Sequence, residues 1–462
     1  MRPLLLRLYE ERYPDGNYGL VILGGAALGL LSASAGHSFM VGVFTDAFIE
    51  ELGISRAGVS SIWTATLVAS SLYVNAVGRA ADTFGAATVV RAAVLPYVVA
   101  LLILSLASDV ASLSAGYLLV RILGPETIDF GCRLCVNMWW VRRRGFAAGL
   151  INAVGALMVA LPSLTSVLEA WLGWRRTLQV MGAVMGLGAA LASGALLDAP
   201  ERFGLAPDGE REAVLPVVAV GEGAEGDAEG GTEGGTEGGA EGGAKANTHE
   251  PNVSCAEAAC SLDFWLLHFY QAAVLVPWNG INFHMAAVVR ETGLGEAGSA
   301  GVPLAFVYLP LACGSFCAAV LYGVLVDYLP PHRKMCALVP PLVSIALCLA
   351  GVSHIRARWH VALFGAALGG FQGANSCALA VIPASLFGRR QLGSIQAAIY
   401  VSAQLASAGG ATALGVAKDS LGSFRPLFAA CSVVQCLLAA VVVARTGWLR
   451  VQGGVKVDNA ST

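Results

Sequence analysis

The sequence predicts an all-α integral membrane protein of about twelve transmembrane helices, arranged as two related bundles of six. Hydrophobic residues make up 56% of the chain and charged residues 13%, and the mean hydropathy is +0.68. A soluble domain typically carries about 25% charged residues. Apolar stretches recur along the whole chain, each close to the roughly 20 residues that a helix needs to cross a bilayer. Backbone groups in lipid must pair within the chain, and the sequence lacks the alternating pattern of a β-barrel, so these stretches are expected to be helices.

The apolar stretches divide the chain into regions. We expect a cytoplasmic N-terminus (1–17), a first six-helix bundle (18–197), a hydrophilic cytoplasmic loop (198–260), a second six-helix bundle (261–444) and a cytoplasmic tail (445–462). The expected spans are 18–44, 57–77, 87–107, 113–140, 146–168, 177–197, 262–288, 302–326, 335–353, 359–383, 394–416 and 425–444. Small residues recur four positions apart within them, as in Gly145/Gly149 and Gly365/Gly369, and such spacings let helix backbones approach closely.

The distribution of basic residues predicts the orientation. If the N-terminus is cytoplasmic, the cytoplasmic segments hold 18 of the 28 Lys and Arg residues and the outside segments hold 8. Arg91 and Arg425, near the ends of their spans, are counted with the adjoining segments, and the other two, Arg121 and Arg133, lie deep within a span. This bias favours both termini in the cytoplasm. We expect the plasma membrane in preference to an organelle membrane, and lipid as the surroundings of the spans.

The loop between the bundles contains Gly-Gly-Thr-Glu and Gly-Gly-Ala-Glu repeats, with seven acidic residues between positions 221 and 245. Such a composition has almost no apolar surface to bury. We therefore expect residues 198–260 to be disordered.

Three loop markers repeat between the bundles at nearly constant spacing. Gly78 and Asp82 follow the second span, and Gly323 and Asp327 follow the eighth, 245 residues later in each case. The other two markers are Arg142-Arg143-Arg144 against Arg389-Arg390, and Gly173-Trp174-Arg175 against Gly422-Ser423-Phe424-Arg425. The repetition indicates a duplicated six-helix unit, a design in which two halves rock around a site near the bilayer midplane.

The Gly-x-x-x-Asp segments of the first marker resemble the loop signature of the major facilitator superfamily. The resemblance implies the major facilitator fold and a gating role for Gly78, Asp82, Gly323 and Asp327, in which each aspartate braces a neighbouring helix end on the cytoplasmic side. Arg333 would supply the basic residue that follows in the second copy. In the first copy, Thr83, Ala86 and Ala87 stand where basic residues usually occur.

Two further segments resemble the monocarboxylate transporters. These are Pro14-Asp15-Gly16-Asn17-Tyr18-Gly19 before the first span, and Trp139-Trp140 with Arg142-Arg143-Arg144-Gly145 at the entry to the fifth. The oxalate/formate antiporters share the second segment. The resemblance implies transport of small organic anions, often together with a proton. These relatives bind carboxylate with basic residues in span 8 or 11, whereas spans 302–326 and 394–416 contain no Lys or Arg here, so a neutral or zwitterionic solute stays open.

The fourth span carries four ionisable residues, Arg121, Glu126, Asp129 and Arg133. Such groups cost roughly 2.5–3.5 kcal/mol each on insertion scales and usually face a cavity or a partner. At 100° per residue they lie within an arc of about 140°, which Pro125 would blur by kinking the helix. One interpretation gives Arg121 the substrate anion and Glu126 or Asp129 a coupled proton. The other has the four residues neutralise one another, with Asp129 and Arg133 paired at i,i+4.

Other polar residues in the spans are candidate substrate contacts. His37 and His284 lie in equivalent spans, 247 residues apart, and are predicted to face each other across the cavity. The alternative for each is a hydrogen-bonded packing role. Uncharged polar residues in spans 7, 10 and 11 would line the site or bridge helices: Asn279, Asn282, Gln372, Asn375, Gln396, Tyr400 and Gln404.

The sequence contains no nucleotide-binding loop, nucleophile motif or metal-ligand cluster. We therefore expect a secondary transporter of a small-molecule solute that is not an enzyme, has no catalytic residue, binds no metal, cofactor or nucleic acid, and works by alternating access. The alternative from another class is a non-transporting membrane sensor on the same fold, which a large structured terminal domain would favour. The short tails favour transport.

Overall fold

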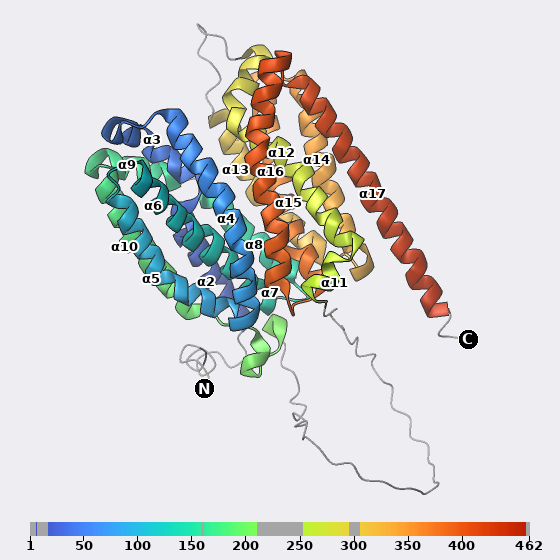
Figure 1. The fold of residues 1–462 in the computed structure, drawn as a ribbon. Helices are drawn as coiled ribbons and strands as arrows, with labels where there is room; N and C mark the ends of the chain where they lie inside the picture. Colours follow the sequence, from blue (N-terminus) through green and yellow to red (C-terminus); the bar gives the residue numbers. More distant parts are fainter. Residues whose placement is uncertain (1–5, 7–16, 159–160, 210–252, 295–304, 459–462) are drawn as a thin grey trace, which may run out of the picture.

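The computed structural model describes residue 6 and residues 17–158, 161–209, 253–294 and 305–458. Within these ranges every regular element is helical, which confirms the predicted fold class. The helices form two bundles that lean on each other, one from the N-terminal part of the chain and one from the C-terminal part (Figure 1). We call residues 17–209 the first half and residues 253–458 the second half.

The helices of the two halves follow the predicted spans, but several spans are built from more than one helix. The first half contains α2 (Gly19–Ser32), η1 (Ser34–Gly36), α3 (Ser38–Leu52), α4 (Arg56–Phe84), α5 (Ala86–Ser105), α6 (Val110–Leu123), η2 (Gly124–Asp129), α7 (Phe130–Trp139), α8 (Arg144–Leu157), α9 (Leu161–Leu172) and α10 (Trp174–Ala195). The second half contains α12 (Leu262–Val289), η6 (Arg290–Leu294), α13 (Ala305–Asp327), η7 (Pro331–Leu338), α14 (Val339–Gly351), η8 (Val352–His354), α15 (Arg358–Phe387), α16 (Leu392–Leu421) and α17 (Arg425–Asp458).

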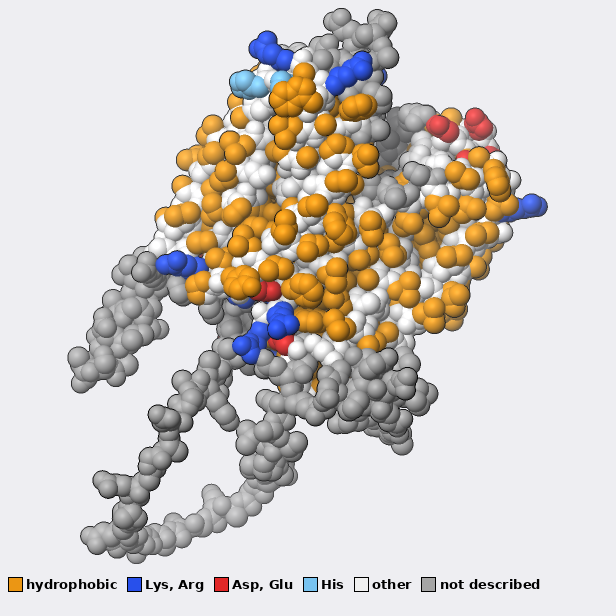
Figure 2. Space-filling view, turned by 180° about the vertical axis from the view of Figure 1, so that it is seen from behind, with side chains coloured by type: hydrophobic (Ala, Val, Ile, Leu, Met, Phe, Trp, Pro, Cys, Tyr) orange, Lys and Arg blue, Asp and Glu red, His pale blue; other side chains and the backbone are white. Residues whose placement is uncertain are grey.

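The outside of the bundles is apolar, as a lipid-facing surface requires. Large side chains such as Leu95, Leu321 and Leu437 are exposed. Hydrophobic side chains cover the middle of the molecule on the face that Figure 2 shows, while most Lys and Arg side chains lie toward its two ends. In the described part of the chain, five helical stretches are long and apolar enough to cross a membrane by length and composition alone. They are 86–105, 174–195, 306–327, 333–354 and 425–447.

The halves meet where glycines allow two backbones to touch. α8 packs on α13 and α4 packs on α16, and a Cβ added to Gly145 would overlap the carbonyl oxygen of Gly323. The same overlap would arise between Gly78 and the carbonyl oxygen of Gly393. The predicted small-residue spacing at Gly145/Gly149 therefore serves close packing, here between the halves.

Each half is braced at the end away from these glycine contacts by a carboxylate near the end of its first span. In the first half, Glu51 accepts hydrogen bonds from Trp174 and from the Arg175 guanidinium. In the second half, Glu291 accepts hydrogen bonds from Ser423 and from Lys418, the latter at 2.8 Å. Trp174 and Arg175 belong to the first copy of the third sequence marker, and Ser423 belongs to its second copy. The two halves therefore share equivalent side-chain contacts as well as sequence markers.

The expectation of disorder throughout 198–260 is wrong at both edges of that loop. Short helices form at η4 (Pro200–Phe203), η5 (Pro207–Gly209) and α11 (Cys255–Ala259), and the acidic repeat between them lies outside the described residues. Polar contacts order these edges. The Asp208 carboxylate accepts the backbone N–H groups of Val141, Arg142 and Arg143 at 2.8 to 3.1 Å, and Ser254 begins α11 with a capping box.

Candidate functional site

Two broken helices surround the middle of the first half. The first predicted span is interrupted at η1, and the fourth is interrupted by a π-turn, η2, that contains Pro125. A Cβ on Gly36 would lie 2.5 Å from the Pro125 ring, so the two breaks fit against each other. The Tyr97 hydroxyl donates a 2.9 Å hydrogen bond to the carbonyl oxygen of Ser32, the last residue of α2 before the break. Irregular backbone at this depth is tolerated because the surrounding protein pairs its polar groups.

The π-turn places Arg121 against Glu126. The Arg121 guanidinium donates to Glu126 Oε1 through Nε and Nη2, both at 3.0 Å, and to the carbonyl oxygen of Gly36 at 3.2 Å. Its charge also lies 5.5 Å from the centre of the Trp63 ring. Arg121 is 4% exposed and Glu126 is fully buried. These residues therefore form a buried, mutually neutralising pair.

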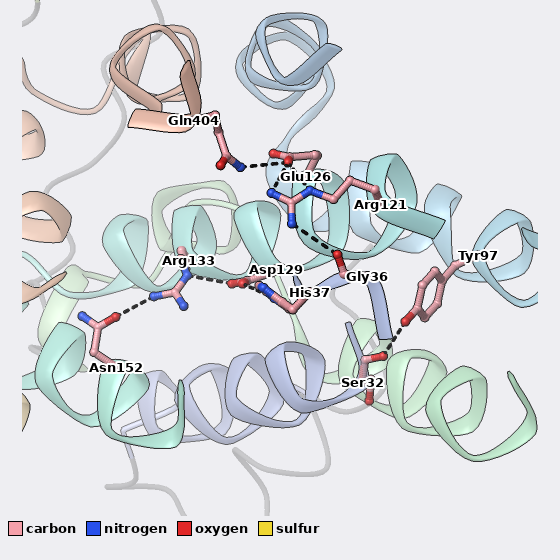
Figure 3. A network of polar contacts seen from close by, with 10 residues as sticks. All are labelled: Ser32, Gly36, His37, Tyr97, Arg121, Glu126, Asp129, Arg133, Asn152 and Gln404. Carbon is pink, nitrogen blue, oxygen red and sulfur yellow. Dashed lines mark hydrogen bonds and ion pairs between the residues drawn. The ribbon is translucent and has the colours of Figure 1, made fainter. Parts of the chain in front are cut away.

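Glu126 also connects the two halves. Its Oε1 atom accepts hydrogen bonds from Ser70 on α4 at 3.3 Å and from Gln404 on α16 of the second half at 3.1 Å (Figure 3). Its Oε2 atom is buried and has no hydrogen-bond partner among the described residues. The contact with Gln404 crosses between the halves next to the helix breaks, about three turns along α16 from Gly393.

A cavity of about 290 Å³ lies between the halves, next to this pair. The first half contributes most of its ionisable groups and the second half contributes neutral polar and apolar groups. It is lined by His37, Pro125, Asp129, Phe130, Arg133, Asn137 and Asn152 from the first half, and by Gln271, Ser376, Leu379, Ala380, Pro383, Gln396, Ile399 and Tyr400 from the second. The volume is at the lower end of the about 300–1,000 Å³ typical of ligand pockets, which suits a small solute.

Arg133 is the cation of this cavity. Its Nε atom donates to Asp129 Oδ1 at 2.7 Å and its Nη1 atom donates to Asn152 Oδ1 at 2.7 Å (Figure 3). The other carboxylate oxygen of Asp129 lies 3.7 Å from Nε2 of His37. The Arg133 side chain is 33% exposed although it lies in the interior of the bundle, so part of the guanidinium faces the cavity.

The predicted substrate and proton residues are only partly brought together. His37, Asp129 and Tyr400 line the cavity, whereas Arg121, Glu126, His284, Asn282 and Asn375 are not among its lining residues. The ring of His284 instead lies 5.8 Å from that of Phe424, Asn282 donates to the backbone of its own helix, and Asn375 accepts a 2.7 Å hydrogen bond from Tyr270. The structure thus places the two histidines in different surroundings.

Several lining residues were not expected from the sequence. The sequence predicts Arg133 only as the partner of Asp129, and the i,i+4 spacing to that cavity residue is the signal that places it on the same face of the helix. Asn137, Asn152, Gln271 and Ser376 were not singled out. Each is an uncharged polar residue within a helix, and the sequence pattern alone does not separate such residues from helix-packing contacts.

The predicted gating aspartates both bind helix starts in the opposite half. Asp82 accepts the backbone N–H groups of Gly393 and Ser394 at 2.8 Å. Asp327 accepts those of Gly145 and Phe146 at 2.6 and 2.8 Å. The first N–H groups of a helix have no partner within it and attract negative charge. We call the end of the bundle that holds Asp82 and Asp327 the latched end.

The glycines of the signature and Arg333 have different surroundings. Gly78 and Gly323 lie at close backbone contacts between the halves, one helical turn before the aspartates. Arg333 is exposed on η7. The latch therefore consists of carboxylates on backbone N–H groups and of glycine contacts.

Comparisons with known proteins agree with this architecture. A family model described as Major Facilitator Superfamily matches residues 22–411. Among solved structures, the crystal structure of the human organic anion transporter MFSD10 (TETRAN) aligns with a TM-score of 0.64, over 93% of this chain and 99% of that chain. At 12% sequence identity this likeness shows the fold alone. No curated protein matches the sequence.

Proposed function

Because the chain belongs to the major facilitator superfamily of membrane transporters, we propose that it is a secondary active transporter of small organic anions. Monocarboxylates are the proposed solutes. It works by alternating access and couples the anion to a proton. The observation that carries the proposal is Arg133, a partly exposed guanidinium in a small cavity between the halves. The human protein MFSD10, which has a similar fold, is an organic anion transporter, and this is compatible with the same solute class.

Arg133 binds the carboxylate of the solute in this proposal. Guanidinium groups bind carboxylates through paired, charge-assisted hydrogen bonds. Arg121 is a weaker candidate because its guanidinium is occupied by Glu126 and Gly36. Tyr400 and His37 contribute further polar contacts from the cavity wall. The interaction of Arg121 with Glu126 holds the broken helices in place.

The charge balance of the cavity supports coupling to a proton. Arg133 and Asp129 together are formally neutral, so an anion that displaces Asp129 from Arg133 would add an uncompensated negative charge in a low-dielectric region. Protonation of Asp129, or of His37 at 3.7 Å from it, restores neutrality. The solute and the proton then bind together and are released together.

Alternating access requires a second state in which the latched end separates. The contacts of Asp82 and Asp327 with the opposite half are those of one state. Both carboxylates lie at the end that the sequence places in the cytoplasm, so the latched state would open to the outside.

A neutral or zwitterionic solute is the second candidate. Two observations favour it. Asp129 already neutralises the charge of Arg133, and spans 302–326 and 394–416 contain no Lys or Arg. A zwitterion would bind the pair without a proton. Independence of uptake from a proton gradient would distinguish it.

The test is uptake of labelled lactate, pyruvate, oxalate, formate and a neutral amino acid into proteoliposomes. Arg133→Gln should abolish anion uptake, and the double variant Asp129→Asn/Arg133→Gln should do the same without leaving a buried carboxylate unpaired. Arg176→Gln, which removes an exposed arginine from the start of α10, is the matched control and should keep uptake. Undiminished uptake by folded Arg133→Gln would remove Arg133 from the site.

The coupling is tested with the same vesicles. Wild-type uptake should rise with an inward proton gradient. Asp129→Asn should lose that response while it still exchanges labelled for unlabelled anion, because exchange needs no net proton movement. A gradient response that survives in Asp129→Asn would assign the proton to another group.

A further inference from the structure

A second cavity lies at the latched end. Its volume is about 140 Å³, and it shares no lining residue with the proposed solute cavity. Its wall contains three arginines, Arg202 of the first half and Arg389 and Arg390 of the second, together with the carboxylates of Asp82 and Asp198. At about 30 Å³ per water molecule in the liquid, the space suits a group of about five non-hydrogen atoms.

The two carboxylates of this wall are bound to helix starts. Asp82 accepts N–H groups in the first turn of α16, and Asp198 accepts the N–H group of Ala87 in the first turn of α5 at 2.9 Å. The second oxygen of Asp198 lies 3.4 Å from Nη1 of Arg202, which is long against the about 2.7–2.9 Å of a charge-assisted hydrogen bond. The aspartates therefore compensate helix N-termini, each worth about +0.5 charge, and neutralise the arginines incompletely.

The arginine side chains come from both halves and keep hydrogen-bond donors available. Arg389 donates to the carbonyl oxygen of Met138, a lining residue, at 2.9 Å and to Glu201 Oε1 at 2.7 Å. Because Glu201 precedes Arg202 in η4, this ion pair brings the second half next to Arg202. The Arg202 side chain is 54% exposed. Arg390 is exposed and has no hydrogen bond or ion pair with a described residue.

We propose that this cavity binds a phosphate group, with Arg202 on one side and Arg389 and Arg390 on the other. The inference needs only the two states of the proposed transport cycle and does not depend on the solute. Three arginines face three carboxylates, the two of the wall and that of Glu201, and the two helix starts add about one positive charge in total. The site is thus positive on balance, and guanidinium groups bind phosphate through paired N–H···O contacts.

A tetrahedral phosphate fits this arrangement better than a carboxylate. It has five non-hydrogen atoms, which matches the volume of the cavity, and it offers an oxygen to guanidinium groups that approach from different sides. A planar carboxylate has two oxygens, which a single arginine can occupy. Free phosphate and a phosphorylated lipid head group share the chemistry that the site would recognise.

A phosphate bound here would stabilise the latched state. Arg202 moves with the first half and Arg389 with the second, so the site comes apart when the latched end separates. A ligand that binds only one state shifts the equilibrium toward that state, by about 11-fold at a ligand concentration of ten times Kd. Phosphate on this side of the membrane therefore lowers the population of the released state.

The test measures backbone hydrogen exchange at Gly393 and Ser394, whose N–H groups are bound by Asp82, in the full-length protein in lipid nanodiscs. In phosphatidylcholine discs, inorganic phosphate at ten times the Kd measured by calorimetry should slow this exchange about tenfold. Chloride at equal ionic strength screens charges to the same extent and should not. If the source is a lipid head group, discs that contain phosphatidylinositol phosphate should slow exchange without added phosphate. Unchanged exchange in both arms would overturn the proposal.

Arg390→Gln removes one guanidinium group of the site and no contact of the latch. It should keep the basal exchange rate and lose most of the slowing. Arg79→Gln is the matched control, because Arg79 is exposed on α4 and lies outside the cavity lining, and it should keep the slowing. Full slowing in the double variant Arg202→Gln/Arg390→Gln would place the anion elsewhere and overturn the site. Exchange needs no transported solute, so these outcomes are separate from the uptake tests.

Discussion

Gly145→Ala tests whether the glycine contact holds the latched end together. The added Cβ would overlap the carbonyl oxygen of Gly323, and both partners are helix backbone. Neither can rotate away, so α8 and α13 would have to separate by about 1 Å, and overpacking of this kind costs about 1–3 kcal/mol. Only the latched state suffers this cost. A two-state equilibrium should therefore shift away from it by about 5- to 150-fold.

Hydrogen exchange of backbone amides reports this shift directly. The N–H groups of Gly145 and Phe146 are bound by Asp327, and those of Gly393 and Ser394 by Asp82. In the released state these helix-start amides have no partner within their own helices. Gly145→Ala should accelerate exchange at both pairs, including the distant one, because each half moves as a unit.

Gly155→Ala provides the control on the same helix. A Cβ at Gly155 meets no atom within 4 Å, so this variant should leave exchange at both pairs unchanged. The reasoning would be refuted by wild-type exchange at both pairs in folded Gly145→Ala, or by equal acceleration in the two variants.

Two further predictions concern the ion pairs. Arg121→Gln leaves Glu126 buried without its partner and should lower the free energy of unfolding by about 3–5 kcal/mol, measured by chemical unfolding in detergent; a fully stable variant that has lost uptake would instead make Arg121 a solute contact. At Glu291, burial alone would raise the pKa, but hydrogen bonds from Lys418 and Ser423 lower it below its usual value. Its contribution to stability is thus present above the unfolded pKa of about 4.3 and is lost as the pH falls through the lower folded pKa. Thermal stability should fall more steeply in acid for the wild type than for Glu291→Gln, and parallel curves would contradict this.

The fold could be predicted because its signals are local or repeated. Each span is marked by its own hydrophobic length, and the duplication places equivalent markers 245 residues apart at Gly78 and Gly323. The helix breaks could not be predicted in the same way. The break at Gly36 depends on the ring of Pro125, a residue 89 positions later in the chain, and contacts over such separations leave no periodic trace.

One such break, the π-turn η2, decides which arginine of the fourth span is available to a solute. On a straight helix Arg121 has no acidic residue at i,i+4, and it therefore resembles an arginine available to a solute. The π-turn brings residues five positions apart onto one face, so that Arg121 meets Glu126. Arg133 lies beyond the turn, keeps its regular spacing to Asp129 and faces the cavity. The sequence predicts Arg121 of this helix as the residue that binds the anion, whereas the function proposed here assigns the anion to Arg133, on the other side of the irregular turn.

The division of charge between the halves has a consequence for switching. Among the described contacts deep in the bundle, the second half presents only neutral groups to the first, Gln404 to Glu126 and Cys377 to Asn152. An ion pair that crosses between the halves, Arg389 with Glu201, lies at the latched end, where the Glu201 side chain is 49% exposed. Separating a neutral hydrogen bond costs about 1 kcal/mol, whereas separating a buried ion pair costs several. Because Arg133, Asp129 and His37 all belong to the first half, the halves can rock without pulling opposite charges apart in lipid.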